Sequence, residues 1–385
     1  MKQAKTYEEI KPLVELCKAG KLFDVQAWIS VGKPINPPLP ASKTRRASPL
    51  QVAIDTGFHS LVELLLHSGA TLKEPRYSPL RHALRKRRLD LVELLVNHGA
   101  DIHSIDMEEV FDTWSNSIVE YFIAKGADLD AGNPLAHALC SRIRPALGIY
   151  KRHKERFFSF QEQINIALRY HCKEGNLKWV SLMLWAGADP YAKGPDLPDG
   201  LPDPESDSCA LELAALYDHY EIFKLKGIKL DPHHPNAYEL IECACRSDRS
   251  DLLKMLLVKG FSPSELDDKG SSLIQYLISS MSWDFNLYPF YSKEKDIDTS
   301  RSREKIKMIH MLVRSGAKWE PKNRSDVNSA RRELLKMRSD YIMELIWILS
   351  EYKACARNTV DELVKTPAMR SLLSRHINLN LVERR

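Results

Sequence analysis

His233, His234, Cys243 and Cys245 are the residues of this sequence that most resemble a metal-binding group. Zinc sites in proteins are built from cysteine and histidine, at spacings that bring the ligands around one ion. The spacing here fits no standard zinc site. In a helix, Cys243 and Cys245 would face different sides, because they are two positions apart. We therefore expect no bound metal and no other cofactor.

The short motifs that carry common enzymatic reactions are missing from the sequence. It contains neither the nucleophile motif GxSxG nor the metalloprotease motif HExxH. The pairs Gly20-Lys21 and Gly32-Lys33 lack the preceding glycine of a phosphate-binding loop. We therefore predict a protein that is not an enzyme and that acts by binding.

Composition and charge narrow the classes of partner. The 385 residues include 56 basic and 51 acidic side chains, for a net charge of +5 and a pI near 8.6. Nucleic-acid-binding domains usually exceed a pI of about 9, so a nucleic-acid partner is not expected. No apolar stretch approaches the roughly 18 residues of a membrane helix. The polar segment Met1–Ile10 does not resemble a secretory signal, so we expect a cytoplasmic location. The cysteines contain no CxxC pair, so we expect free thiols.

A repeated phrase defines the elements that would position a binding surface. Ser48 opens SPLQVAIDTGFHSLVELLLHSGATL, and Ser78, 30 positions later, opens SPLRHALRKRRLDLVELLVNHGADI. Each serine can cap the start of a helix, and Pro49 or Pro79 suits the first helical position. The sequence therefore predicts a short helix at the start of each copy.

A second helix follows in each copy of the phrase. Leucines at three- and four-residue spacing in LVELL predict this helix, and we expect Leu64 and Leu94 to be buried in it. Gly69 or Gly99 is expected to end it in a left-handed conformation, which glycine adopts at little cost. Each unit is thus two short antiparallel helices and a loop.

These units resemble ankyrin repeats, whose first helix carries T-P-L-H-x-A and whose end is Gly-Ala-Asp. Ser48–Ala53 and Ser78–Ala83 match the first-helix motif. The ending recurs as Gly69-Ala70, Gly99-Ala100-Asp101, Gly126-Ala127-Asp128, Gly187-Ala188-Asp189 and Gly316-Ala317. The resemblance implies an all-α ankyrin-repeat solenoid of helix-turn-helix units with short loop or hairpin fingers. It also implies a non-catalytic role in protein–protein interaction.

The resemblance covers most of the chain. We expect about nine or ten units in residues 1–320, the first ones degenerate, and a helical capping region in residues 321–385. The interval from Gly126 to Gly187 should hold a hidden unit that begins at Asn133. The interval from Gly260 to Gly316 should hold one unit with an insertion. In the cap, Asp326–Ala356 should form two helices and Thr359–Ile377 one.

Two stretches interrupt the pattern. Residues 193–208 are rich in proline and acidic side chains, which predicts a projecting loop. It is either a solvated insertion or an acidic segment that competes with acidic partners or steers a basic one. Residues 282–303 carry many aromatic side chains, which either form an interface or cover their own repeat.

The resemblance places partner contacts on a concave face formed by loop tips and by the exposed sides of the first helices. The candidate residues are Lys43, Arg45, Arg46, Arg76, Tyr77, Arg81, His82, Arg85, Lys86, Arg88, His137, Trp283, Tyr288 and Tyr291. The run Arg85–Arg88 and a second basic run at residues 151–156 suit a protein partner with an acidic surface. The alternative is that both runs are solvated helix ends.

Several roles agree with this sequence. The first is an adaptor that binds a partner protein through the concave face. The second is a regulatory or neutralising subunit, such as an immunity protein, an antitoxin or a component of a bacterial defence system. A third is an enzyme whose site lies in an insertion or near the C-terminus. A fourth is a ubiquitin-ligase substrate adaptor, because Pro367–Leu381 has a similar leucine spacing to a C-terminal box of some ankyrin families, with Ser374 near its cysteine position. The oligomeric state is open.

Overall fold

The computed structural model describes residues 3–38, 46–73, 78–201, 207–264, 272–281, 300–319, 324–335 and 339–371. In these ranges the regular elements are helices, and isolated bridges pair Gln3 with Asn36 and Gly194 with Ser208. Contacts divide the chain into two compact units. Unit 1 comprises Met1–Ala167 and Leu197–Leu201, and unit 2 comprises Leu168–Asp196 and Pro202–Arg385.

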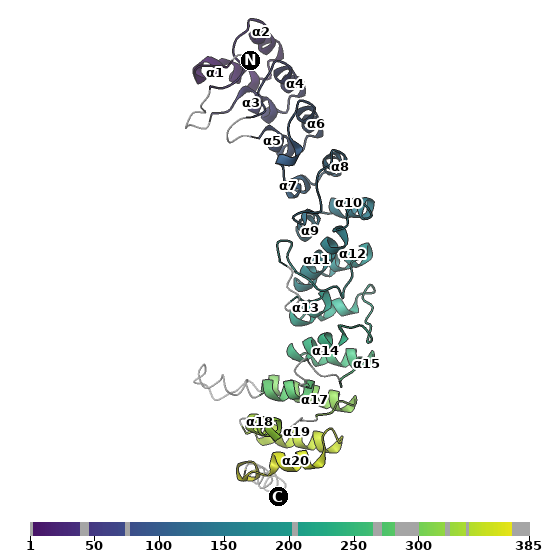
Figure 1. The fold of residues 1–385 in the computed structure, drawn as a ribbon. Coiled ribbons are helices and arrows are strands. Elements are labelled where there is room, and N and C mark those ends of the chain that lie inside the picture. Colours follow the sequence, from purple (N-terminus) through teal and green to yellow (C-terminus); the bar gives the residue numbers. More distant parts are fainter. Residues whose placement is uncertain are drawn as a thin grey trace. The chain divides into compact units, whose positions relative to one another are not determined.

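Unit 1 is a series of helix pairs in which first helices pack beside first helices and second helices beside second helices (Figure 1). The pairs are α1 (Tyr7–Lys18) and α2 (Leu22–Ser30), α3 (Pro49–Thr56) and α4 (His59–His67), α5 (Pro79–Arg85) and α6 (Leu89–Asn97), α7 (Met107–Phe111) and α8 (Asn116–Ala124), and α9 (Pro134–Cys140) and α10 (Pro145–His153). A 3-10 turn, η1 (Ile102–Ser104), precedes α7, and α11 (Phe160–Lys173) contains the boundary between the units.

Unit 2 continues with further helix pairs. It contains α12 (Leu177–Ala186), α13 (Ala210–Leu216) with η2 (Tyr220–Lys224), α14 (Ala237–Arg246) with α15 (Ser250–Val258), a helix at residues 273–281, α17 (Ser300–Arg314), α18 (Arg324–Leu334), α19 (Ser339–Glu351) and α20 (Arg357–Val364). None of the helices within the described ranges is long and apolar enough to cross a membrane.

Further helices lie in both intervals for which a hidden unit is predicted. The interval from Gly126 to Gly187 contains the pair α9 and α10 before α11 and α12, and the interval from Gly260 to Gly316 contains residues 273–281 and α17. The predicted insertion 282–303 ends earlier than expected, because residues 300–303 form the first turn of α17; the rest of it lies outside the described residues.

The predicted last helix, Thr359–Ile377, is wrong in its extent. Helix α20 ends at Val364, residues 365–366 are not helical, and a new helix begins at Pro367. Proline has no backbone N–H, and its ring disfavours helical geometry at the residue before it, so the chain breaks there.

The core confirms the second helix of the repeated phrase but shifts its register. Leu61, Val62 and Leu65 of α4 are fully buried, whereas Leu64 is partly exposed. In α6, Leu95 is buried and Leu94 is partly exposed. The prediction that Leu64 and Leu94 are buried is therefore wrong by one position.

The ends of these helices form as predicted. The Ser48 Oγ accepts a hydrogen bond from the Gln51 backbone N–H at 3.1 Å, and the Ser78 Oγ accepts one from the Arg81 N–H at 3.3 Å. Gly69 ends its unit with φ +89°, in the left-handed region. The resulting caps leave few unsatisfied backbone groups at the helix ends.

Helix α9 begins differently, with an acceptor from another repeat. Asn133 has a left-handed backbone and makes no side-chain cap to α9. Instead, the Oε1 of Gln163 in α11 accepts from the N–H groups of Leu135 at 2.8 Å and Ala136 at 3.2 Å. The Gln163 Nε2 donates to the Leu129 carbonyl at 2.7 Å. This fully buried side chain therefore fixes α9 against α11.

Residues just before the second helices tie consecutive pairs together. In unit 1, the Arg88 Nη1 donates to the Gly57 carbonyl at 3.1 Å, in the turn after α3. In unit 2, the His219 Nε2 lies 2.9 Å from the Lys173 carbonyl, and the Arg249 Nη2 lies 2.9 Å from Asp218 Oδ1. Within each unit, a contact of this kind links neighbouring turns and holds successive first helices in register.

Candidate partner-binding face

The structure describes about half of the predicted partner-binding residues. Lys43, Arg45, Arg76, Tyr77, Trp283, Tyr288 and Tyr291 lie outside the described residues. Arg46, Arg81, His82, Arg85, Lys86, Arg88 and His137 all lie in unit 1. Arg81, His82 and Arg85 lie on α5, Lys86 and Arg88 follow it, and His137 lies on α9. We use the name first-helix face for the exposed sides of α3, α5, α7 and α9 together with the turns that follow these helices.

Ion pairs connect neighbouring helices across this face. His82 Nε2 of α5 lies 3.6 Å from Asp55 Oδ1 of α3, and Lys86 Nζ lies 3.9 Å from the same oxygen. Arg81 Nη2 lies 2.6 Å from Glu109 Oε1 of α7. These side chains are partly exposed, so each pair contributes at most about 1 kcal/mol to stability. The positive charges of Lys86 and Arg81 are thus each paired with a carboxylate within the face.

His137 of α9 is held between two carboxylates. Its Nε2 lies 3.4 Å from Glu108 Oε1 of α7 and 3.0 Å from Asp199 Oδ1. Asn133 Nδ2 also donates to the Pro198 carbonyl at 2.8 Å. The predicted projecting loop is therefore folded back at residues 197–201, where the chain's own acidic side chain contacts α9 in unit 1.

The other end of this loop is tied down inside unit 2. The Arg169 guanidinium is fully buried, and its Nε donates to the Pro195 carbonyl at 2.7 Å. Lys173 Nζ lies 2.5 Å from Asp196 Oδ2. The expectation of a free, solvated segment is wrong for these residues, while residues 202–206 lie outside the described part.

Arg88 is occupied by structural contacts. Its Nε and Nη2 donate to the two carboxylate oxygens of Asp90 at 2.8 Å and 2.6 Å, in addition to the bond to Gly57. The hydrogen bond from Arg88 is the main cause that lowers the pKa of Asp90, against a smaller opposing effect of burial. In this conformation, three of the donors of Arg88 are already used within the protein.

Arg46 lies apart from this row, against α1. Its guanidinium stands over the Tyr7 ring, 4.7 Å from the centroid, and its Nη1 is 3.4 Å from Glu8 Oε1. It is therefore a partner-binding candidate at the edge of unit 1 and not part of the first-helix face.

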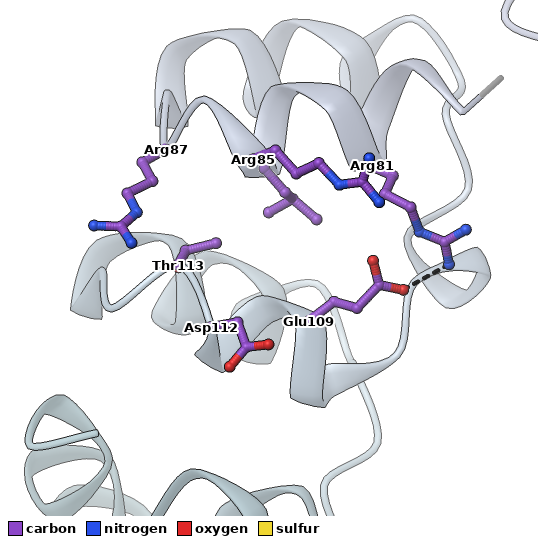
Figure 2. A pocket seen from close by; sticks show the side chains of 7 residues that line it. Arg81, Arg85, Arg87, Glu109, Asp112 and Thr113 are labelled. Carbon is purple, nitrogen blue, oxygen red and sulfur yellow. Dashed lines mark ion pairs between the residues drawn. The ribbon is translucent and has the colours of Figure 1, made fainter. Parts of the chain in front are cut away.

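A polar pocket lies between α5 and α7. Arg81, Leu84, Arg85 and Arg87 line one side, and Glu109, Asp112 and Thr113 line the other. Figure 2 shows the Arg85 and Arg87 side chains at opposite ends of the pocket, with the carboxylate of Asp112, the residue after α7, below them. The volume is about 200 Å³. Helix α7 has only 5 residues, so the first-helix layer is short at this point.

Arg87 is a pocket residue that the predicted site set does not contain. Neither Arg85 nor Arg87 has an ion-pair partner among the described residues, although Arg81 and Arg88 do. The sequence signal was present in the run Arg85–Arg88. Its members differ in whether they meet a carboxylate: Lys86 pairs with Asp55 of the preceding repeat and Arg88 with Asp90 of its own.

The second basic run has its partners on a second helix. Arg152 Nε and His153 Nε2 contact the two oxygens of Glu120 in α8 at 2.6 Å and 2.8 Å. Burial alone would raise the pKa of Glu120, but the hydrogen bonds from His153 and Arg152 outweigh it and lower this pKa. This part of the run fixes α10 to α8.

The residues considered for metal binding have other roles. His234 stacks on Tyr191 with ring centroids 4.1 Å apart, and burial raises the pKa of the Cys243 thiol to about 12. Within the described ranges, no three His, Cys, Asp or Glu side chains are grouped so as to hold a metal ion. All seven cysteines are free.

Comparisons with known proteins agree with the repeat pattern in the N-terminal part of the chain. Residues 13–106 match the family model for ankyrin repeats in three copies. Among solved structures, the human ASB11 ankyrin repeat domain matches with 14% identity, over 76% of this chain and 97% of that chain, at a TM-score of 0.30. A search of curated proteins gives no match. Residues 13–106 therefore carry the ankyrin-repeat signature, and the regular elements of the described residues are helices.

Proposed function

We propose that this protein is a non-catalytic adaptor that binds another protein through the first-helix face of unit 1. Ankyrin repeats generally serve as protein–protein interaction modules. The observation that carries the proposal is the chemistry of this face: α3, α5, α7 and α9 bury their apolar sides and present charged side chains outward. Charged, partly exposed rows of this kind suit recognition of a complementary surface.

The partner that fits this face is acidic. Arg81 and Lys86 are paired with Glu109 and Asp55, whereas Arg85 and Arg87 face the single carboxylate of Asp112. At the pocket between α5 and α7, the unbalanced charge is therefore positive. The free cysteines accord with a reducing compartment, and we propose the cytoplasm as the setting.

Affinity capture from cells of the source organism tests the proposal. The intact chain is compared with a charge-reversal variant of the face, Arg85→Glu/Lys86→Glu. The matched control, Lys125→Glu/Lys154→Glu, reverses two exposed lysines at the ends of second helices α8 and α10. We expect a protein that copurifies with the wild type and the control and is lost from the face variant.

Thermal unfolding of both variants shows whether the substitutions leave the fold intact. A partner retained by the folded face variant, or lost equally from the control, would contradict binding through this face. Weaker capture at high salt is also expected, because exposed charges are screened beyond a distance of about 10 Å at 0.1 M salt.

A further inference from the structure

The pocket between α5 and α7 is large enough to admit part of a ligand. Its volume of about 200 Å³ is several times the roughly 30 Å³ that one water molecule occupies in the liquid. Leu84 and Thr113, both nearly fully buried, contribute to its lining. The remaining walls are charged, so the pocket suits a polar group and not an apolar side chain.

Some of the charged side chains around this pocket have ion-pair partners within the described residues, and others do not. Glu109 already pairs with Arg81 at 2.6 Å on one side of the pocket (Figure 2). Arg85 and Arg87 are exposed and have no ion pair among the described residues, and neither does Asp112. Two guanidinium groups thus remain available against one carboxylate.

The same face already holds a carboxylate that comes from elsewhere in the chain. Asp199 contacts His137 of α9 at 3.0 Å, although the two residues are 62 positions apart. Asp199 is 85% exposed, so this contact is made at the surface and without a buried environment. Unit 1 therefore shows on its own first-helix face the kind of group that the face accepts.

We propose that the pocket between α5 and α7 binds carboxylate side chains of an acidic segment of the partner, with Arg85 contacting the segment at one end of the pocket and Arg87 at the other. Guanidinium groups form short, charge-assisted hydrogen bonds with carboxylates. This inference rests on the proposed function and adds to it the contact residues and the chemical class of the bound group.

Asp112 sets a limit on what the pocket accepts. Its carboxylate lies on the α7 side of the pocket, opposite the arginines (Figure 2). A bound anion is therefore attracted by Arg85 and Arg87 and repelled by Asp112. Removing the Asp112 charge should strengthen binding of an acidic peptide, which a pocket of purely structural charges would not show.

Fluorescence anisotropy with labelled hexaglutamate at low ionic strength tests the assignment, with labelled hexaglutamine as the uncharged comparison. Arg85→Gln and Arg87→Gln should each weaken hexaglutamate binding by about tenfold. Asp112→Asn should strengthen it by about threefold. Hexaglutamine should not bind to any of the variants.

Arg142→Gln is the matched control. Arg142 is an exposed arginine in the turn after α9, with φ +63°, and Arg87 occupies the same place after α5, with φ +55°. The two substitutions therefore remove the same charge from the same backbone conformation, at two different repeats. Arg142→Gln should bind hexaglutamate as the wild type does.

The assignment is overturned if the wild type does not bind hexaglutamate, if Arg142→Gln weakens binding as much as Arg87→Gln, or if Asp112→Asn leaves the affinity unchanged. The proposed function is tested independently of the pocket. If a partner is captured through the first-helix face but hexaglutamate binding does not depend on Arg85 and Arg87, the face still binds the partner and the pocket assignment is wrong.

Discussion

At the scale of single residues, adjacent arginines of one basic run have different roles. Arg88 binds Asp90 with two hydrogen bonds and the Gly57 carbonyl with a third, so it links two repeats. Arg87, the residue before it, lines the pocket and has no ion pair among the described residues. Substitution of Arg88 should therefore affect stability, and substitution of Arg87 should affect binding.

Arg88→Gln should lower the stability in a way that depends on pH. Because Arg88 lowers the pKa of Asp90 in the folded state, their interaction stabilises the fold above the ordinary aspartate pKa of about 3.9 and is lost as the pH falls through the lowered value. Both side chains are more than a third exposed, so the loss at pH 7 should be about 1 kcal/mol or less.

Urea unfolding at a series of pH values measures this difference. The gap between the wild type and Arg88→Gln should shrink below a pH of about 4, leaving the contribution of the bond to Gly57. Arg87→Gln, which removes an arginine without an ion pair in the described structure, serves as the comparison and should show no such pH dependence. A gap that widens in acid would contradict the assigned role of Asp90.

At the scale of elements, the start of α9 depends on a side chain from the next repeat. Gln163 accepts hydrogen bonds from Leu135 and Ala136 and donates one to Leu129, all from a fully buried position. Buried donors that lose their acceptor retain a desolvation cost of about 1–3 kcal/mol each. The junction of α9 and α11 is therefore held by polar contacts as well as by apolar packing.

Gln163→Leu should destabilise unit 1 by at least about 2 kcal/mol, because it leaves two backbone donors and one carbonyl without partners. Gln26→Leu, at an exposed position of α2 in the same unit, is the control and should have a much smaller effect. Hydrogen exchange should show the loss of protection first at α9. Equal midpoints of unfolding for the two variants would disprove the capping role.

Local elements could be predicted from the sequence, and contacts between repeats could not. The serine caps at Ser48 and Ser78 and the glycine ends depend on neighbouring residues, so the repeated phrase predicts them. The cap from Gln163 and the folding back of Asp199 onto His137 join residues that are far apart in the chain. The prediction for Leu64 is wrong by one position because Leu64 and Leu65 both fit a three- or four-residue helical spacing. Only the position of the neighbouring helix decides which of the two is buried.

For the predicted binding site, too, local features follow from the sequence and contacts between distant residues do not. The sequence pattern selects the exposed positions of the first helices, and the structure places His82, Arg85, Lys86 and His137 there. It does not reveal which charges the folded chain neutralises. The predicted site therefore contains Arg88, which pairs with Asp90, and omits Arg87, which lines the pocket.

At the scale of the whole molecule, the net charge of +5 is an average that conceals local pairing. Both basic runs make ion pairs with neighbouring repeats, and the acidic loop contacts His137 in unit 1 and Lys173 in unit 2. At the pocket between α5 and α7, a small positive region remains at Arg85 and Arg87. Partner recognition should therefore depend on local position far more than on overall charge.

Site-specific photocrosslinking shows whether the partner contacts the first-helix face. Benzoylphenylalanine replaces either Lys86 on the first-helix face or Lys125 at the end of a second helix, in the full chain inside the source cell. If the first-helix face binds the partner, a specific protein should crosslink to position 86 and none to position 125. Crosslinking of one partner from position 125 alone, or equally from both positions, would contradict it.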